Sequence, residues 1–264
     1  KFNKIKKLID SKKNILNIYD VDFEYKETFT KLSNKSNKYI KTCFSIGLNL
    51  VKKVKKSVLI NGPVSKKTFL RKKYLGITEY LSNKTKSKNE VMLIYNDTLS
   101  VSPLTTHIPL KQVNKNITKK KIVNNVIKIN SFYKNCLKKN IKFAVLGLNP
   151  HCETVSGFSE EDKIISPAIS YLKKSGLNIN GPFSADTFFL KNNIEKFDVV
   201  VGMYHDQVLT PIKTLFKFEA INLTIGLPFI RISPDHGPNS IMLGKNKSDP
   251  ASFLYAMKFI ENIK

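Results

Sequence analysis

Four histidines are the residues of this chain whose type and position best suit metal chemistry. Three follow apolar, strand-like runs: His107 lies in TTHIPL, His151 in GLNPHC and His205 in MYHDQ, while His236 lies in SPDHGP. Loops at the carboxyl ends of strands in an open α/β sheet converge on one crevice, so three imidazoles could meet there. Three imidazole ligands with open positions describe a catalytic zinc-type site. For each ring alone, a hydrogen-bonded loop histidine is the alternative, and His236 could equally be a supporting or a surface residue.

Arginine is so scarce that one copy stands out as a candidate anion-binding residue. Of 45 basic residues only Arg71 and Arg231 are arginines, and Arg231 lies in FIRISP, shortly after Asn222 and Lys213. A guanidinium holds phosphate or carboxylate through a bidentate fork, and a lysine does so as a point charge. For Lys213 a solvated surface position is the alternative, because the chain is rich in lysine.

Two aspartates are candidate acid or base groups. Asp206 directly follows His205, and Asp186 lies in SADT. An ion pair and, for Asp186, a helix cap are the alternatives. The cysteines form no C-x-x-C pair and leave one over, so they predict neither a disulfide framework nor a cysteine zinc site.

Length and composition indicate a globular protein. A chain of 264 residues that is 41% hydrophobic can bury one large core or two lobes that share a cleft. No apolar run reaches the roughly 18 residues of a membrane span, and the N-terminus lacks an apolar secretory stretch. We therefore predict a cytoplasmic protein with no membrane partner.

The net charge of +25 would ordinarily suggest a nucleic-acid partner. Nucleic-acid sites favour clustered charge and arginine forks, whereas the basic residues here are nearly all lysines, spread along the chain beside abundant Asn and Ile. Compositional drift explains the charge more simply, and we predict no specific nucleic-acid partner.

The spacing of apolar residues predicts alternating strands and helices. Ile40, Phe44 and Leu48 recur at helical spacing, while short apolar runs bounded by Gly, Pro or Asn predict strands. Ser159, followed by acids, predicts a helix start. Alternation of this kind is typical of an α/β fold with a largely parallel sheet. The predicted strands are 57–60, 91–95, the stretch on to 106, 142–148, 199–204 and 220–227, and the predicted helices are 37–55, 118–139, 159–176 and 250–263.

Seven motifs, in order from about Ser57 to the C-terminus, resemble those of the 4-hydroxythreonine-4-phosphate dehydrogenase family of vitamin B6 biosynthesis. They are INGPVSK, GITEY, TTHIPL, GLNPH, NGPFSADTFF, MYHDQ and NLTIGLPFIRISPDHG. The resemblance implies an isocitrate/isopropylmalate dehydrogenase-like fold of two α/β lobes around a central, mostly parallel sheet. It also implies a homodimer whose active site lies in the cleft and at the dimer interface. We expect one lobe of roughly 1–76 plus 222–264 and a second of 77–221.

The resemblance also assigns roles to residues. It implies NAD as the hydride acceptor and zinc, magnesium or cobalt as the metal, although no G-x-G-x-x-G fingerprint occurs. The implied metal ligands are His107, His151 and His205, and the implied substrate contacts are Thr78, Lys213, Asn222 and Arg231. The implied reaction oxidises and decarboxylates 4-phosphohydroxy-L-threonine.

Three departures from the family pattern affect these expectations. Ile77 replaces the histidine of the family's GHTE motif and cannot donate a side-chain hydrogen bond to substrate. Glu153, Val155 and Ser156 stand where the family usually has glycine, which would alter the approach of the backbone to a ligand. The family's opening strand and Gly/Pro-rich turn are not found before KFNK, which suggests a fragment or a degraded variant with an exposed sheet edge.

Two other functions are also compatible with the sequence. Ile77 favours a paralogue that acts on another phosphorylated hydroxy acid, such as a four-carbon sugar acid phosphate. The charge favours a basic nucleic-acid-binding or inactive structural protein.

Overall fold

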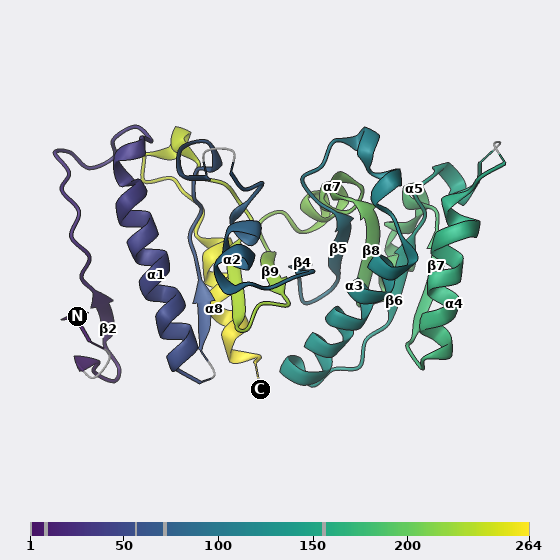
Figure 1. The fold of residues 1–264 in the computed structure, drawn as a ribbon, viewed down its shortest axis with the longest axis horizontal. Helices are drawn as coiled ribbons and strands as arrows, with labels where there is room; N and C mark the ends of the chain where they lie inside the picture. Colours follow the sequence, from purple (N-terminus) through teal and green to yellow (C-terminus); the bar gives the residue numbers. More distant parts are fainter. Residues whose placement is uncertain (1, 8–9, 56, 71–72, 155–156, 264) are drawn as a thin grey trace.

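An eight-stranded sheet runs through the molecule (Figure 1). The computed structural model describes residues 2–7, 10–55, 57–70, 73–154 and 157–263. The strand order is β3-β10-β9-β4-β5-β8-β6-β7, and β1 pairs with β2 in a separate parallel two-stranded sheet. The strands are β1 (Phe2–Ile5), β2 (Leu16–Tyr19), β3 (Val58–Ile60), β4 (Val91–Tyr95), β5 (Ser100–Thr105), β6 (Phe143–Leu146), β7 (Ile179–Phe183), β8 (Val199–Tyr204), β9 (Ile221–Ile225) and β10 (Ile230–Pro234).

The sheet is mixed and mostly parallel. Strands β5, β8, β6 and β7 run parallel to one another, and β10 runs parallel to β3. Strand β9 is antiparallel to both β10 and β4, and β4 is antiparallel to β5. The links β4–β5 and β9–β10 are too short for a crossover, so each closes an antiparallel hairpin. The α/β class and the mostly parallel sheet expected from the sequence are confirmed.

Helices cover both faces of the sheet. Helices α3, α4 and α8 pack on one face, α5, α6 and α7 on the other, and α1 and α2 form a third core beside β3 (Figure 1). The helices are α1 (Asn37–Lys53), α2 (Ile77–Thr85), α3 (Lys119–Phe132), α4 (Ser166–Lys174), α5 (Ala185–Phe188), α6 (Lys191–Ile194), α7 (His205–Phe216) and α8 (Ala251–Glu261). The lobe limits of 1–76 plus 222–264 and 77–221 stay a prediction.

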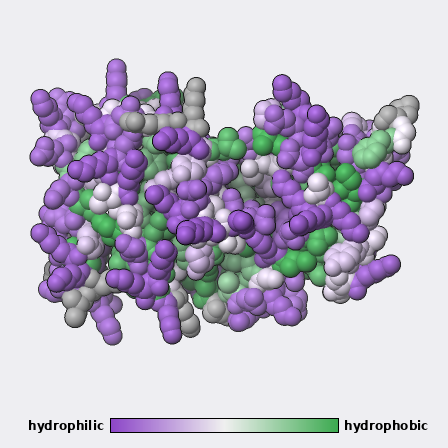
Figure 2. All heavy atoms as spheres, viewed as in Figure 1, coloured by the Kyte–Doolittle hydropathy of each residue, from purple (hydrophilic) through white to green (hydrophobic). Residues whose placement is uncertain are grey.

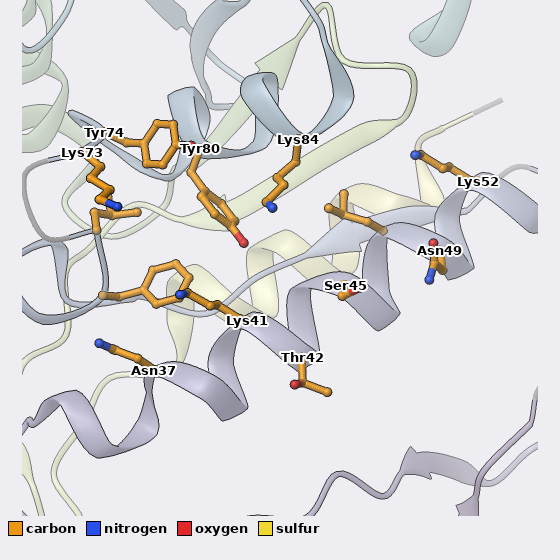
Figure 3. A pocket seen from close by; sticks show the side chains of 13 residues that line it. Asn37, Lys41, Thr42, Ser45, Asn49, Lys52, Lys73, Tyr74, Tyr80 and Lys84 are labelled. Atoms are coloured by element: carbon orange, nitrogen blue, oxygen red, sulfur yellow. The ribbon is translucent and has the colours of Figure 1, made fainter.

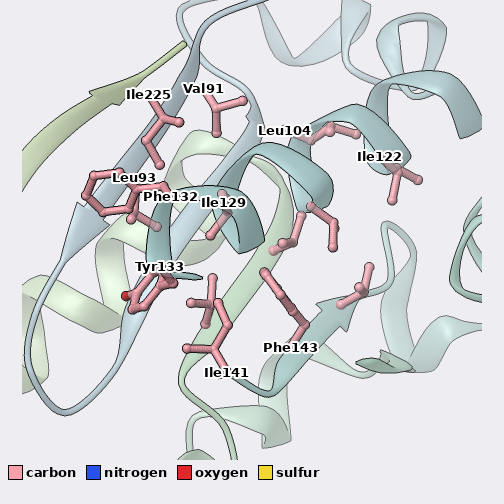
Figure 4. Close-up of a cluster of buried hydrophobic side chains, with 14 of the residues drawn as sticks. Val91, Leu93, Leu104, Ile122, Ile129, Phe132, Tyr133, Ile141, Phe143 and Ile225 are labelled. Carbon is pink, nitrogen blue, oxygen red and sulfur yellow. The ribbon is translucent and has the colours of Figure 1, made fainter. Parts of the chain in front are cut away.

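Alternate residues of the central strands enter opposite cores. In β6, Phe143 and Val145 belong to the core under α3 and α4, whereas Ala144 and Leu146 belong to the core under α7. Figure 4 shows Phe143 in the first core, to which Ile129 of α3 also belongs. Because the strand period is two, a strand buried on both faces is apolar throughout. Full burial of each such side chain stabilises the fold by about 1.5–3 kcal/mol.

The helices expected from the sequence are present with adjusted limits. The helix predicted over 118–139 forms α3 as far as Phe132 and then a π-helical turn, η6 (Tyr133–Leu137). Ser159 caps the next helical segment, since its hydroxyl accepts a hydrogen bond from the Asp162 amide at 3.2 Å. That segment is the π-helical turn η8 (Glu161–Ile165), which leads into α4.

The face shown in Figure 2 is mostly hydrophilic, and narrower apolar areas lie between its polar side chains. Among the helices of the described residues, none has the length and apolar character that a membrane crossing requires.

Candidate active site

The fold brings two of the predicted imidazoles together. Strands β5 and β8 are parallel neighbours, with Thr105 opposite Tyr204, so the residues just beyond them emerge at the same edge of the sheet. The rings of His107 and His205 accordingly lie with centroids 5.8 Å apart and planes inclined by 39°. Each side chain is about one-third exposed, which leaves the pair open to a ligand.

Each of these rings has a carboxylate near its Nδ1 atom. The Nδ1 of His205 lies 2.7 Å from Asp206 Oδ1, and the Nδ1 of His107 lies 3.9 Å from Glu79 Oε1. The Nε2 of His107 lies 3.2 Å from the ammonium of Lys66, so this nitrogen already faces a cation. Histidine ligands of metals are commonly backed by a carboxylate in this way. A divalent cation bound at Nε2 of His107 would have to displace the Lys66 ammonium.

His151 lies apart from this pair. It follows β6 in the short helical turn η7 (Pro150–Cys152), where its φ is 55°, and its side chain is 73% exposed. Its Nδ1 is 3.8 Å from Asp186 Oδ2. Within the described part of the chain, no cluster of three or more His, Cys, Asp or Glu side chains could hold a metal ion. A single chain therefore assembles two of the three predicted ligands.

The candidate acids are both engaged with histidines. Asp206 is the partner of His205, and Asp186 is the partner of His151. The Ser184 hydroxyl donates a hydrogen bond to Asp186, and this bond, with the nearby His151, lowers the pKa of that carboxyl. His236 is exposed, and its Nδ1 is 3.1 Å from the Gly237 carbonyl oxygen.

A buried carboxylate that sequence reasoning treated only as a first-turn acid organises the His151 loop. Glu161 is 1% exposed and accepts hydrogen bonds from the amides of Leu148 and Asn149 at 2.7 and 2.8 Å. The Asn149 side-chain amide and the Ser159 hydroxyl also donate to it. Burial alone would raise the pKa of Glu161, but these hydrogen bonds lower it on balance.

Gln207 links the His205 segment to the His151 segment, a role that no sequence pattern indicated. Its side-chain amide donates to the Gly147 carbonyl at 2.7 Å, and its oxygen accepts from the Met203 amide at 2.7 Å. The bridge holds the end of β8 against the end of β6.

The face of β9 and β10 near the histidines carries a buried cation. Arg231 is 3% exposed; its Nε donates to Asn61 Oδ1 at 2.7 Å and its Nη1 to Thr224 Oγ1 at 3.1 Å. Burial lowers the pKa of Arg231 to about 10, an effect that nearby Glu79 opposes, so the guanidinium remains charged at neutral pH. Among the described residues, no carboxylate lies within ion-pair distance of it. A buried guanidinium of this kind suits an anionic ligand.

Thr78 and Asn222 belong to the same polar surface. Thr78 Oγ1 lies 3.4 Å from Thr224 Oγ1, the hydroxyl that accepts from Arg231. Asn222 lies two residues before Thr224 on β9, on the same face of the strand, and its side-chain oxygen is buried without a hydrogen-bond partner. Thr78 therefore lies next to the hydroxyl that Arg231 contacts, and Asn222 lies one position further along the same face of β9.

Lys213 lies in a different environment. Its ammonium is 2.6 Å from Asp235 Oδ2 and 3.0 Å from the Asp235 carbonyl oxygen, just beyond the end of β10. This ion pair connects α7 to the strand that carries Arg231.

The structure shows where two of the residues that depart from the family pattern lie. Ile77 is half-buried and packs against the third core, formed with α1 and β3. Glu153 is exposed, whereas Val155 and Ser156 lie outside the described residues.

A separate groove of about 750 Å³ lies between α1, the turn η3 (Lys66–Leu70) and α2. Figure 3 shows Lys41, Lys73 and Lys84 around it, with Tyr80 of α2 facing the opening. The groove contains none of the residues predicted to bind metal or substrate.

Comparison with known proteins identifies the family. The family model described as "Pyridoxal phosphate biosynthetic protein PdxA" matches residues 1–260. The chain belongs to the PdxA family. It is thus a dehydrogenase of that family, which implies a nicotinamide dinucleotide, NAD or NADP, and a phosphorylated small-molecule substrate.

Individual relatives of the PdxA family differ in substrate. A 4-hydroxythreonine-4-phosphate dehydrogenase of Sulfurihydrogenibium sp. (strain YO3AOP1) is 39% identical over 251 residues, covering 92% of this chain and 75% of the relative. A D-threonate 4-phosphate dehydrogenase of Pectobacterium atrosepticum is 34% identical over 186 residues, covering 70% and 57%, respectively. The crystal structure of a 4-hydroxythreonine-4-phosphate dehydrogenase from Klebsiella pneumoniae has a TM-score of 0.80 and 26% identity, covering 98% and 82%.

Proposed function

We propose that this chain oxidises and decarboxylates 4-phosphohydroxy-L-threonine to 3-amino-2-oxopropyl phosphate in pyridoxal 5'-phosphate biosynthesis, with NAD as hydride acceptor. One observation carries the proposal. Consecutive residues at the start of α2 join the two halves of the site: Thr78 contacts the Thr224–Arg231 pair, and Glu79 lies beside His107. The Arg231 guanidinium, proposed to bind an anion, and the imidazole pair, proposed to bind a metal ion, therefore lie on either side of this short segment.

The roles of the residues follow from their chemistry. Arg231, with Thr78 and Asn222, would bind an anionic group of the substrate and fix its orientation. His107 and His205 would hold zinc, magnesium or cobalt, with His151 as the third ligand, brought to the ion by association of two chains as a homodimer. When bound, the cation lowers the pKa of the substrate hydroxyl and stabilises the charge that develops during decarboxylation.

Lys213 would contribute to anion binding by a different route. In the free chain its ammonium is paired with Asp235, so a substrate phosphate must either share the ammonium with this carboxylate or displace the carboxylate from it. The carboxylates of Asp186 and Asp206 remain candidate proton acceptors, with Asp206 the nearer to the imidazole pair through His205.

A second substrate is favoured by Ile77. Its side chain offers no hydrogen bond and packs in an apolar cluster, so a contact to substrate that the family histidine would make is lost. D-threonate 4-phosphate is the alternative, because a relative that is 34% identical carries that name.

The test is reduction of NAD by the purified full chain, followed by absorbance with each substrate in turn and with zinc, magnesium or cobalt added. We expect turnover with 4-phosphohydroxy-L-threonine. Turnover with D-threonate 4-phosphate alone would replace the first proposal by the second.

Assembly and the nucleic-acid alternative are tested with the same preparation. We expect a homodimer by light scattering and no specific binding to duplex DNA or RNA at physiological ionic strength. Salt-dependent binding together with no retained metal would support a basic binding protein instead.

A further inference from the structure

Asn61 stands at the end of β3 and holds one edge of the Arg231 guanidinium. Its backbone amide donates to the Ile232 carbonyl at 3.1 Å, beside the parallel pairing of β3 with β10. Its side-chain oxygen accepts from Arg231 Nε at 2.7 Å, and its side-chain amide donates to the Gly62 carbonyl at 2.9 Å. Because the oxygen only accepts and the nitrogen only donates, these two hydrogen bonds fix which end of the amide faces the guanidinium.

The hydrogen-bond partners of Arg231 are uncharged, although the residue is buried. A buried charge in a protein is usually paired with an opposite charge, because its removal from water is otherwise costly. Arg231 is 3% exposed, yet its hydrogen bonds among the described residues go to the Asn61 amide oxygen and the Thr224 hydroxyl. No carboxylate of the described residues therefore neutralises this buried cation by an ion pair.

The unused donors of Arg231 lie at the other end of its guanidinium. A guanidinium has one N–H on Nε and two on each Nη atom. Asn61 accepts the hydrogen bond from Nε, and Thr224 accepts one from Nη1. No described residue accepts from Nη2, so the adjacent Nη1 and Nη2 atoms can still donate two parallel hydrogen bonds to one anion.

We propose that Asn61 is a positioning residue that holds Arg231 by its Nε edge without neutralising it, and so presents the charged Nη1–Nη2 edge to an anionic group of the substrate. The inference rests on the proposed function for the identity of the substrate, whose phosphate and carboxylate both suit such an edge. The anion site itself can be measured without metal, NAD or turnover.

A structural role in the turn after β3 is the competing explanation. The strand ends at Asn61-Gly62-Pro63, and asparagine favours turns because its side chain bonds to the nearby backbone. In that case the side chain of Asn61 would matter for the stability of the chain and not for the charge that Arg231 offers to a ligand.

The substitution Asn61→Asp separates the two explanations. Aspartate also suits turns and keeps an oxygen for the Nε hydrogen bond, but its charge pairs with Arg231. It loses the donor to the Gly62 carbonyl, and Asn61→Ala, which loses both side-chain hydrogen bonds, accounts for that loss. Asn192→Asp, the same charge change at an exposed position of α6, is the matched control.

The first measurement is the dissociation constant for inorganic phosphate, by calorimetry on the metal-free full chain at physiological ionic strength. Binding that persists in Arg231→Gln comes from other cations of the chain and is subtracted. We expect Asn61→Asp to weaken the remaining binding by about 10- to 100-fold, Asn61→Ala to weaken it less, and Asn192→Asp to leave it unchanged. The same series with D-threonate, which has the carboxylate but no phosphate, shows which anionic group the Arg231 edge binds.

The second measurement is the unfolding midpoint of the same proteins without added anion. We expect Asn61→Asp to match or exceed the unchanged chain, because its carboxylate pairs with the buried guanidinium, and Asn61→Ala to unfold at a lower midpoint. An Asn61→Asp chain that is less stable than Asn61→Ala would assign Asn61 to the turn and overturn the inference.

The third measurement is the rate of NAD reduction with the phosphorylated substrate. We expect Asn61→Asp to raise KM by the factor found for the anion and to leave kcat unchanged, since Asn61 acts through Arg231 on binding. Anion binding as tight in Asn61→Asp as in the unchanged chain would overturn the inference, as would anion binding that Arg231→Gln does not reduce. Absence of turnover with an intact pattern of anion binding would refute the proposed function alone.

Discussion

The proposed anion-binding face of β9 and β10 and the imidazole pair beyond β5 and β8 differ in how far one chain completes them. Arg231 is buried, and two fixed hydrogen bonds hold its guanidinium in place. His107 and His205 are one-third exposed, and the third predicted ligand, His151, lies apart from them. The proposed anion site is therefore preformed in the single chain, whereas the proposed metal site would need a second chain to supply its third ligand.

The largest loss of activity is expected at the imidazole pair, because one chain supplies only two of the three proposed metal ligands. We expect His205→Ala to abolish metal retention and turnover, because the pair that one chain supplies would be reduced to one ring. Metal content by mass spectrometry and the rate of NAD reduction measure this. His236→Ala is the control, since His236 is exposed and its ring contacts only its own loop among the described residues. Full activity in His205→Ala would show that the imidazole pair is not the metal site.

A smaller loss, in affinity for the substrate, is expected when Arg231 on the face of β9 and β10 is changed. Lysine in place of Arg231 cannot form the bidentate pair that a guanidinium makes with a phosphate, and a hydrogen bond with a charged partner is worth about 1.5–3 kcal/mol. We expect Arg231→Lys to raise the KM for the phosphorylated substrate about 100-fold, with metal retention unchanged. Lys258→Gln, a charge change at an exposed position of α8, should leave KM unaltered. Loss of metal in Arg231→Lys would show that the two regions are not independent.

The smallest expected effect is a loss of stability when the hydrogen bonds that hold the His151 loop are weakened. Glu161→Gln replaces a carboxylate that accepts four hydrogen bonds, so we expect a loss of about 1–3 kcal/mol in the free energy of unfolding at pH 7. Denaturant titration measures it, and Glu195→Gln, at an exposed site, is the control.

The loss should depend on pH with a defined sign. The folded-state pKa of Glu161 is lowered, so its contribution is full above the unfolded value of about 4.3 and disappears as pH falls through the folded value. The stabilities of the unchanged chain and Glu161→Gln should therefore converge in acid. An equal difference at pH 7 and in acid would mean that the carboxylate charge plays no part.

Strand ends could be predicted from the sequence because they follow apolar runs, and this was enough to place His107 beside His205. The orientation of His151 could not be predicted, because it depends on a positive φ within η7 and on the hydrogen bonds of Glu161. The position of Glu79 beside His107 was also missed, since α2 has few apolar residues in a helical pattern and its glutamate resembles an ordinary first-turn acid.

The antiparallel pairing of β9 and β10 was also not predicted from the sequence. The strand predicted over 220–227 includes the turn at Gly226, whose φ is 99°, and β10 was not predicted at all. The turn signal at Gly226 and Pro228 was available and would have indicated a hairpin that places Arg231 opposite Thr224.

The central claim is that His107 and His205 share a divalent cation in a site that a second chain completes. An anomalous-scattering map of crystals loaded with Zn²⁺ tests it most directly. We expect one peak per chain, about 2.0–2.1 Å from Nε2 of both rings, with an imidazole from a His151 as the third ligand. A zinc peak at any other place, with both Nε2 atoms beyond coordination distance, would contradict the claim.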